Sequence, residues 1–139
     1  LDISKIIKIK DGKDIALITS GSMMLTALKV KDLLESKGIS TALFSMPMIK
    51  PIDEKGIKKI QDKFKMIVSI EEHYITGGAG SAIEDVLIGR KGAKFLKLGN
   101  PDIFLHVTGS REYLLKKCGL SPDKIVARVM SYLKNSPIP

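Results

Sequence analysis

The sequence predicts an α/β fold in which a mainly parallel β-sheet is covered by helices on both faces. Short apolar runs alternate with amphipathic stretches, in the order strand, helix, strand, helix, strand, helix, strand and then helices. Strands that alternate with helices favour crossover connections and therefore a parallel sheet. No internal repeat, low-complexity tract or linker interrupts the pattern. Residues 1–139 are predicted to form a single domain with an ordered core at 6–134 and loose ends at 1–5 and 135–139.

Five apolar or β-branched runs are predicted strands. They cover residues 6–9, 14–19, 41–46, 66–70 and 93–98. Asp11-Gly12 is a turn signal between the first two. The run at 101–109 is ambiguous between a strand and an apolar loop, and His106 within it is predicted to be a packed core histidine.

Helices are predicted where apolar residues recur every three or four positions. These stripes are Met23, Ala27, Val30 and Leu34; Ile57, Ile60 and Phe64; Ala79, Ile83, Val86 and Leu87; and Ile125, Val129 and Leu133. A short helix is also predicted through Tyr113 and Leu114. Ser22, Asp53 and Ser110 stand where an N-cap is expected. Gly38 and Gly119 are expected to stop helices.

Composition predicts a soluble globular protein without nucleic acid or membrane partners. The chain has a formal net charge of +8, but 20 of its 23 basic residues are lysine. Arginine, which suits bidentate phosphate and base contacts, is scarce. No apolar run approaches the roughly 18 residues of a membrane span. Cys118 is the only cysteine and is predicted to be partly buried. A disulfide framework is thus excluded, and a cytoplasmic location is expected.

Two loops at predicted strand ends form the candidate site. Its residues are Ser20, Gly21, Ser22, Glu71, Glu72, His73, Gly77, Gly78 and Gly80. Ligands of open parallel sheets sit beyond the carboxyl ends of the strands, where the winding reverses. Helix N-termini there favour anions. We expect these residues to bind an anion or to face a neighbouring domain.

The chemistry of this site stays open between two interpretations. Gly78-Ala79-Gly80 lacks the third small residue of a dinucleotide fingerprint and follows the third strand, not the first. The glycines would instead allow a tight turn and a helix start close to the sheet. His73 beside Glu71 and Glu72 is either a general base or a simple hydrogen-bonding residue. No complete nucleophile, base and orienting group appears, and no metal-ligand spacing, so no catalytic or metal residue is predicted.

Several segments, taken in order, resemble the C-terminal domain of transketolase-type thiamine enzymes. They are DIALITSGS (14–22), LLESKGIS (33–40), IKPID (49–53), SIEEH (69–73), GGAGSA (77–82), GSREYLL (109–115) and CGLSPDKI (118–125). The resemblance covers roughly residues 6–134. The family it indicates includes transketolase, deoxyxylulose phosphate synthase and the beta subunits of two-oxoacid dehydrogenases. It implies three layers, α/β/α, around a mixed five-stranded sheet with residues 6–9 as one antiparallel edge strand.

The resemblance also implies a function for the whole enzyme. Thiamine diphosphate and Mg²⁺ would lie between pyrophosphate- and pyrimidine-binding domains, so no cofactor is expected in this chain. The chain would support domain packing and homodimerisation and be inactive alone. The complete enzyme would transfer two-carbon ketol units between sugar phosphates. The alternative is a stand-alone anion- or nucleotide-binding α/β module.

Overall fold

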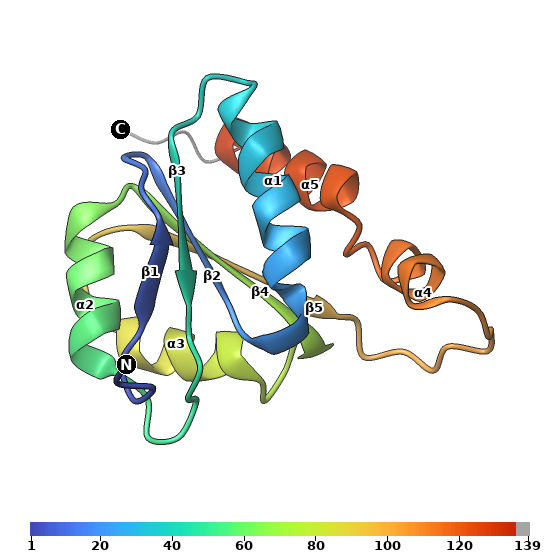
Figure 1. The fold of residues 1–139 in the computed structure, drawn as a ribbon, viewed down its shortest axis with the longest axis horizontal. Coiled ribbons are helices and arrows are strands. Elements are labelled where there is room, and N and C mark those ends of the chain that lie inside the picture. Colours follow the sequence, from blue (N-terminus) through green and yellow to red (C-terminus); the bar gives the residue numbers. More distant parts are fainter. Residues whose placement is uncertain (136–139) are drawn as a thin grey trace.

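A five-stranded mixed sheet with helices on both faces forms the body of the structure, a computed structural model that describes residues 1–135 (Figure 1). The strands are β1 (Ile7–Lys10), β2 (Ile15–Thr19), β3 (Thr41–Ser45), β4 (Met66–Tyr74) and β5 (Lys94–Asn100). Their order across the sheet is β1-β3-β2-β4-β5, and only the β1–β3 pairing is antiparallel. The predicted mixed sheet with one antiparallel edge strand is confirmed.

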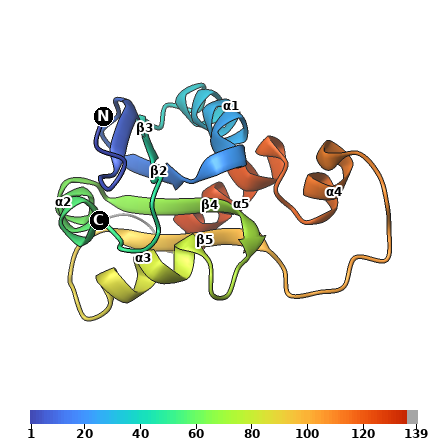
Figure 2. The same cartoon turned by 60° about the horizontal axis from the view of Figure 1, so that its bottom comes forward.

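The helices divide between the two faces of the sheet. They are the short 3₁₀ helix η1 (Gly21–Met23), α1 (Met24–Glu35), α2 (Glu54–Lys63), α3 (Ala79–Leu87), α4 (Arg111–Lys117) and α5 (Pro122–Asn135). Residues of α1, α4 and α5 share one apolar cluster, and residues of α2 and α3 share the other. Figures 1 and 2 show the resulting three layers. Within the described residues, no helix is long and apolar enough to cross a membrane.

The burial of strand β2 on both faces explains why its sequence is an uninterrupted apolar run. Ile15 and Leu17 face the α1/α5 side, whereas Ala16 and Ile18 face the α2/α3 side. All four are buried. A strand covered on both faces has no polar side to alternate with its apolar one.

Helix boundaries follow the predicted capping residues with one exception. Asp53 accepts a hydrogen bond from Gly56 N, and Ser110 accepts one from Tyr113 N. The prediction for Ser22 is wrong. This residue lies inside η1, α1 begins two residues later at Met24, and the Ser22 hydroxyl donates to Glu72 Oε2 at 2.6 Å.

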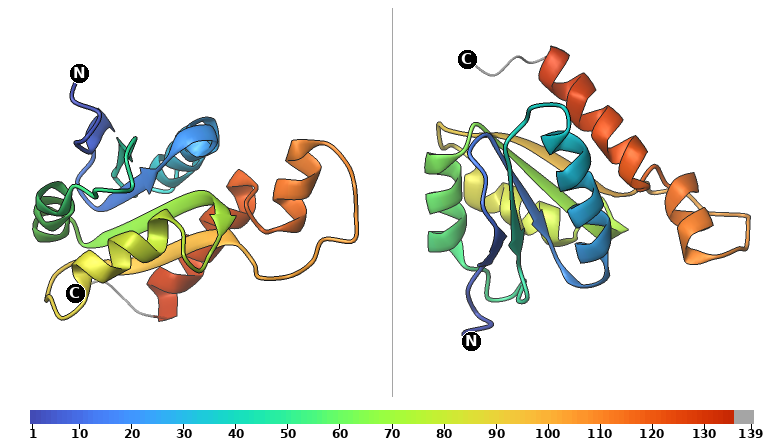
Figure 3. Two further views of the ribbon diagram at one scale, coloured as in Figure 1. Left: turned by 90° about the horizontal axis from the view of Figure 1, so that it is seen from below. Right: turned by 45° about the horizontal axis from the view of Figure 1, so that its top comes forward.

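Two further predictions are corrected or refined. Strand β4 continues four residues past the predicted end because its polar tail still pairs with β5, where Tyr74 lies opposite Asn100. His106 is exposed and is therefore not a core histidine. Residues 101–110 form an irregular loop that extends away from the sheet with α4 (Figures 2 and 3). Cys118 is half-buried, as predicted. Of the predicted loose C-terminal residues 135–139, Asn135 is the last residue of α5, and residues 136–139 lie outside the described part of the chain.

Candidate functional site

A cleft opens where the winding of the sheet reverses. The chain leaves β2 toward α1 on one face and leaves the neighbouring β4 toward α3 on the other. The cleft has a volume of about 350 Å³. It is lined by Ser20, Gly21, Ser22, Ile49, Glu71, Glu72, His73, Gly77, Gly78 and Ala79. The fold therefore brings together every predicted site residue except Gly80.

Glu71 lies between the end of β4 and the start of α3. Its side chain points to the α3 face, and the residue is only 3% exposed. The carboxylate accepts from Ala79 N at 2.6 Å and from Gly80 N at 2.9 Å. Charge-assisted bonds of this kind satisfy helix N-terminal donors and complement the helix dipole. Glu71 thus occupies the anion position that a helix N-terminus would otherwise offer to a ligand.

The glycines next to Glu71 make room for its side chain and for the sheet. A Cβ on Gly78 would lie 2.1 Å from Glu71 Oε2, and a Cβ on Gly80 would lie 2.8 Å from Ser69 Oγ. Gly77 has a φ of +80°, which disfavours other residues. The interpretation of these glycines as a tight turn and a close helix start is confirmed.

Glu72 points away from Glu71 and joins three segments of the chain. Arg111 Nη2 lies 2.6 Å from Glu72 Oε2, and Arg111 Nε lies 3.0 Å from Glu72 Oε1. Arg111 also donates to Ser22 O at 3.2 Å. The hydrogen bonds from Arg111, followed by that from Ser22, outweigh partial desolvation and hold the pKa of Glu72 below its ordinary value. We call Ser22, Glu72 and Arg111 the Arg111 clamp.

Removing the Arg111 clamp is expected to cost stability in a pH-dependent way. Arg111→Gln should lower the free energy of unfolding by about 1 kcal/mol at pH 7, as expected for a multiply bonded but exposed pair. Because the folded pKa of Glu72 lies below 4.5, its contribution is complete above that pH and disappears as the pH falls through the folded value. Urea unfolding at pH 7 and pH 3 should show the difference from the original chain shrinking at pH 3.

The control for this prediction is Arg128→Gln, the same substitution on the exposed surface of α5. Arg128 takes part in none of the ion pairs recorded for residues 1–135, so little change is expected. A loss for Arg111→Gln that stays constant down to pH 3 would contradict a role for the Glu72 charge.

His73 does not pair with either glutamate. It is exposed, and its Nδ1 lies 3.0 Å from the backbone oxygen of Tyr74. Glu71 is bound to α3 and Glu72 to Arg111. The general-base interpretation therefore has no paired carboxylate, and the hydrogen-bonding interpretation fits the geometry.

The cleft has the wrong charge for a diphosphate and the wrong donors for a metal. The carboxylates of Glu71 and Glu72 line it, and the N–H groups of Ala79 and Gly80 are already engaged. Among the residues the structure describes, no group of three or more His, Cys, Asp or Glu side chains could hold a metal ion. The residues present do not fit thiamine diphosphate with Mg²⁺, and we derive no step through that cofactor on this chain.

Arg111 and Ile49 belong to the site but were not among its predicted residues. Ile49 comes from the loop after β3 and lines the cleft. Arg111 lies 39 residues beyond Glu72 in the sequence. No local signal predicts that contact, because it depends on how the loop at 101–110 returns the chain to the sheet.

The fold and the cleft define a crossover α/β domain with a switch-point cleft, in which Glu71 binds the N–H groups at the start of α3 and Glu72 binds Arg111. The sequence model described as "Transketolase, C-terminal domain" matches residues 4–125. The chain belongs to the transketolase C-terminal domain family.

Two curated relatives and two solved structures illustrate the similarity. The chain is 37% identical over 125 residues to a putative transketolase C-terminal section of Methanocaldococcus jannaschii, covering 89% of this chain and 38% of that protein. It is 33% identical over 128 residues to 1-deoxy-D-xylulose-5-phosphate synthase of Desulforudis audaxviator, covering 91% of this chain and 20% of that protein. The chain therefore spans well under half the length of these relatives.

The structural neighbours agree. A split gene transketolase, described as an inactive beta4 tetramer, superposes with a TM-score of 0.87 at 31% identity, covering 96% of this chain and 44% of that chain. A transketolase mutant of Pichia stipitis superposes with a TM-score of 0.67 at 18% identity, covering 94% and 18%. The second likeness shows the fold alone.

Proposed function

We propose that this chain is the C-terminal domain of a thiamine diphosphate-dependent enzyme that transfers two-carbon ketol units between sugar phosphates. In this proposal the domain supports domain packing and dimerisation and is inactive alone. The observation that carries the proposal is the family match over residues 4–125, together with a cleft whose two carboxylates are bound to groups of the domain itself. Pyrophosphate- and pyrimidine-binding domains or subunits would supply the cofactor site.

An exposed apolar loop supports a packing role. Ile103, Phe104 and Val107 all lie on the surface of the loop at 101–110, and Phe104 is 84% exposed. Adjacent apolar side chains held in water are typical of a surface that another protein segment covers. The loop is tied back to the sheet by the Arg111 clamp. It is thereby held in position for a partner.

The position of the chain's first residues also supports packing at the cleft. Strand β1 runs antiparallel to the other strands, so it begins at the end of the sheet where β2 and β4 terminate (Figure 1). A domain joined to the N-terminal side of β1 would arrive at that end of the sheet. His73 and Glu72 are exposed there and would meet it.

Complementation tests the proposal. The 139-residue chain is expected to show no ketol transfer alone from a ketose phosphate donor to an aldose phosphate acceptor. Mixing it with a polypeptide that carries the cofactor domains of the same enzyme should give turnover and a complex that elutes as one species. A parallel assay for 1-deoxy-D-xylulose 5-phosphate formation would identify the reaction subtype. Turnover by the chain alone would contradict the proposal.

Substitutions at the cleft refine the test. His73→Ala should weaken the complex while leaving turnover of the assembled complex nearly unchanged, because His73 is proposed to pack and not to catalyse. Lys37→Ala, on the surface beyond α1, is the control and should change neither quantity. Loss of turnover in a fully assembled His73→Ala complex would assign the residue to catalysis instead.

A further inference from the structure

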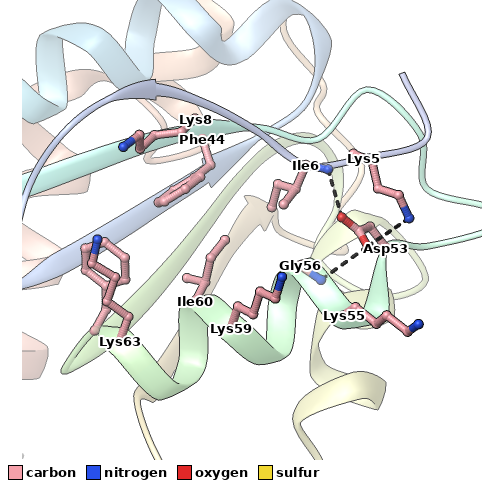
Figure 4. A pocket seen from close by; sticks show the side chains of 11 residues that line it. Lys5, Ile6, Lys8, Phe44, Asp53, Lys55, Gly56, Lys59, Ile60 and Lys63 are labelled. Atoms are coloured by element: carbon pink, nitrogen blue, oxygen red, sulfur yellow. Dashed lines mark hydrogen bonds and ion pairs between the residues drawn. The ribbon is translucent and has the colours of Figure 1, made fainter. Parts of the chain in front are cut away.

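A second and larger concavity lies between the edge strand β1 and helix α2 (Figure 4). Its volume is about 450 Å³. It is lined by Lys5, Ile6, Lys8, Phe44, Asp53, Lys55, Gly56, Lys59, Ile60, Lys63 and Phe64. We call it the lysine groove. It lies on the α2 side of the sheet edge and shares no residue with the switch-point cleft.

The floor of the lysine groove is apolar and aromatic. The rings of Phe44 and Phe64 meet edge to face, with centroids 5.8 Å apart and an interplanar angle of 86°. Ile6 and Ile60 complete this floor (Figure 4). Phe44, Ile60 and Phe64 are buried, and Lys63 Nζ lies 5.6 Å from the centroid of the Phe64 ring. A flat apolar group of a ligand would be desolvated against the exposed edges of these side chains.

Five lysines stand around the floor. Lys55, Lys59 and Lys63 recur every fourth residue along α2, and Lys5 and Lys8 come from the β1 side. Like charges at this spacing destabilise a helix. In the described part of the chain, the recorded ion pairs use Lys5 with Asp53 and Lys8 with Asp11. None uses Lys55, Lys59 or Lys63, whereas the fourth lysine of α2, Lys58, pairs with Glu54 and does not line the groove.

Asp53 holds the two banks of the groove together. Its carboxylate accepts from Ile6 N at 3.1 Å on the β1 side and from Gly56 N at 3.2 Å on α2. Lys5 Nζ lies 3.6 Å away. The Asp53 carboxylate is thus already bonded to neighbouring groups and lies at one end of the groove. Lys8 and Lys63 lie at the other end (Figure 4). The groove is preformed, and Lys59 and Lys63, which none of the ion pairs recorded among residues 1–135 uses, remain to pair with an anion.

We propose that the lysine groove binds a small organic phosphate that carries a planar apolar ring, with a nucleoside monophosphate as the representative class. The volume lies within the roughly 300–1,000 Å³ of small-ligand sites. Lysine ammonium groups bind phosphate as point charges, and the phenylalanine floor receives the ring. The site does not depend on the proposed transferase function.

Titration with AMP tests this proposal on the isolated 139-residue chain. Amide NMR shifts are expected to change at Gly56, Lys59 and Ile60. Inorganic phosphate, ribose 5-phosphate and adenosine should each bind at least tenfold more weakly, because each lacks either the ring or the anion. Lys59→Gln with Lys63→Gln should weaken AMP binding at least tenfold. The matched control, Lys37→Gln with Lys91→Gln, removes the same charge elsewhere and should change binding less than twofold.

Other outcomes overturn the proposal. Equal weakening by the control pair would mean that only net charge attracts AMP. Ribose 5-phosphate binding as tightly as AMP would remove the role of the aromatic floor. Shifts confined to residues 20–22 and 77–79 would place the anion in the switch-point cleft. None of these results bears on ketol transfer, which the complementation assay measures.

Discussion

Replacing Glu71 by alanine is expected to lower the free energy of unfolding by about 3 kcal/mol, the sum of lost charge-assisted hydrogen bonds and an unfilled helix start. The carboxylate is buried and holds two backbone N–H groups at the start of α3. Once it is gone, these two backbone donors lose their acceptor within the domain. Urea unfolding followed by circular dichroism measures the loss.

Two companion variants sharpen this prediction. Glu72→Ala removes the next carboxylate along the strand, which is far more exposed, and should cost only about 1 kcal/mol. Glu71→Gln keeps the shape of the side chain but leaves a single acceptor oxygen. Its loss of stability should therefore lie between those of Glu71→Ala and Glu72→Ala. A Glu71→Ala chain as stable as Glu72→Ala would show that α3 does not need this cap.

Gly12→Ala is expected to be comparably damaging, at about 3 kcal/mol, for a steric reason. A Cβ at Gly12 would lie 2.1 Å from both Ala42 N and Thr41 C. These are backbone atoms at the start of β3, which is paired on both sides with β1 and β2, so they cannot rotate away as a side chain could. Thermal and urea unfolding of the variant measure the cost.

Gly38→Ala provides the matched comparison. Gly38 has a φ of +79° but has nothing within 4 Å of its would-be Cβ. The same substitution there should cost only about 1 kcal/mol, from left-handed backbone strain. Equal losses of stability in the two variants would contradict the large steric cost expected from the contact between Gly12 and β3.

Elements whose residues carry a local signal were predicted well. The doubly covered strand β2 shows an uninterrupted apolar run, and Asp53 and Ser110 cap helices as their positions indicate. The fold class followed from such signals, and its mixed sheet and antiparallel edge from the family resemblance. The switch-point position of the cleft also followed, because sheet topology brings the ends of β2 and β4 together.

Features that depend on distant partners were missed. The sequence predicts a loop for the polar tail of β4, because no nearby residue signals the pairing of Tyr74 with Asn100. It predicts an N-cap at Ser22, although the Ser22 hydroxyl donates to Glu72, 50 residues away. It predicts a buried His106 because the neighbouring residues are apolar, whereas the structure leaves that loop exposed. Apolar sequence predicts burial only where the chain itself supplies the covering surface.

The position of Glu71 has a mechanical consequence. The acceptor that organises the start of α3 is carried by the strand that precedes it, eight residues earlier, and not by the turn between them. The Glu71 side chain thereby couples the end of β4 directly to the first turn of α3. A force that a neighbouring domain applies at the exposed tip, Tyr74 to Gly77, would move strand and helix as one piece, while the tip alone flexes.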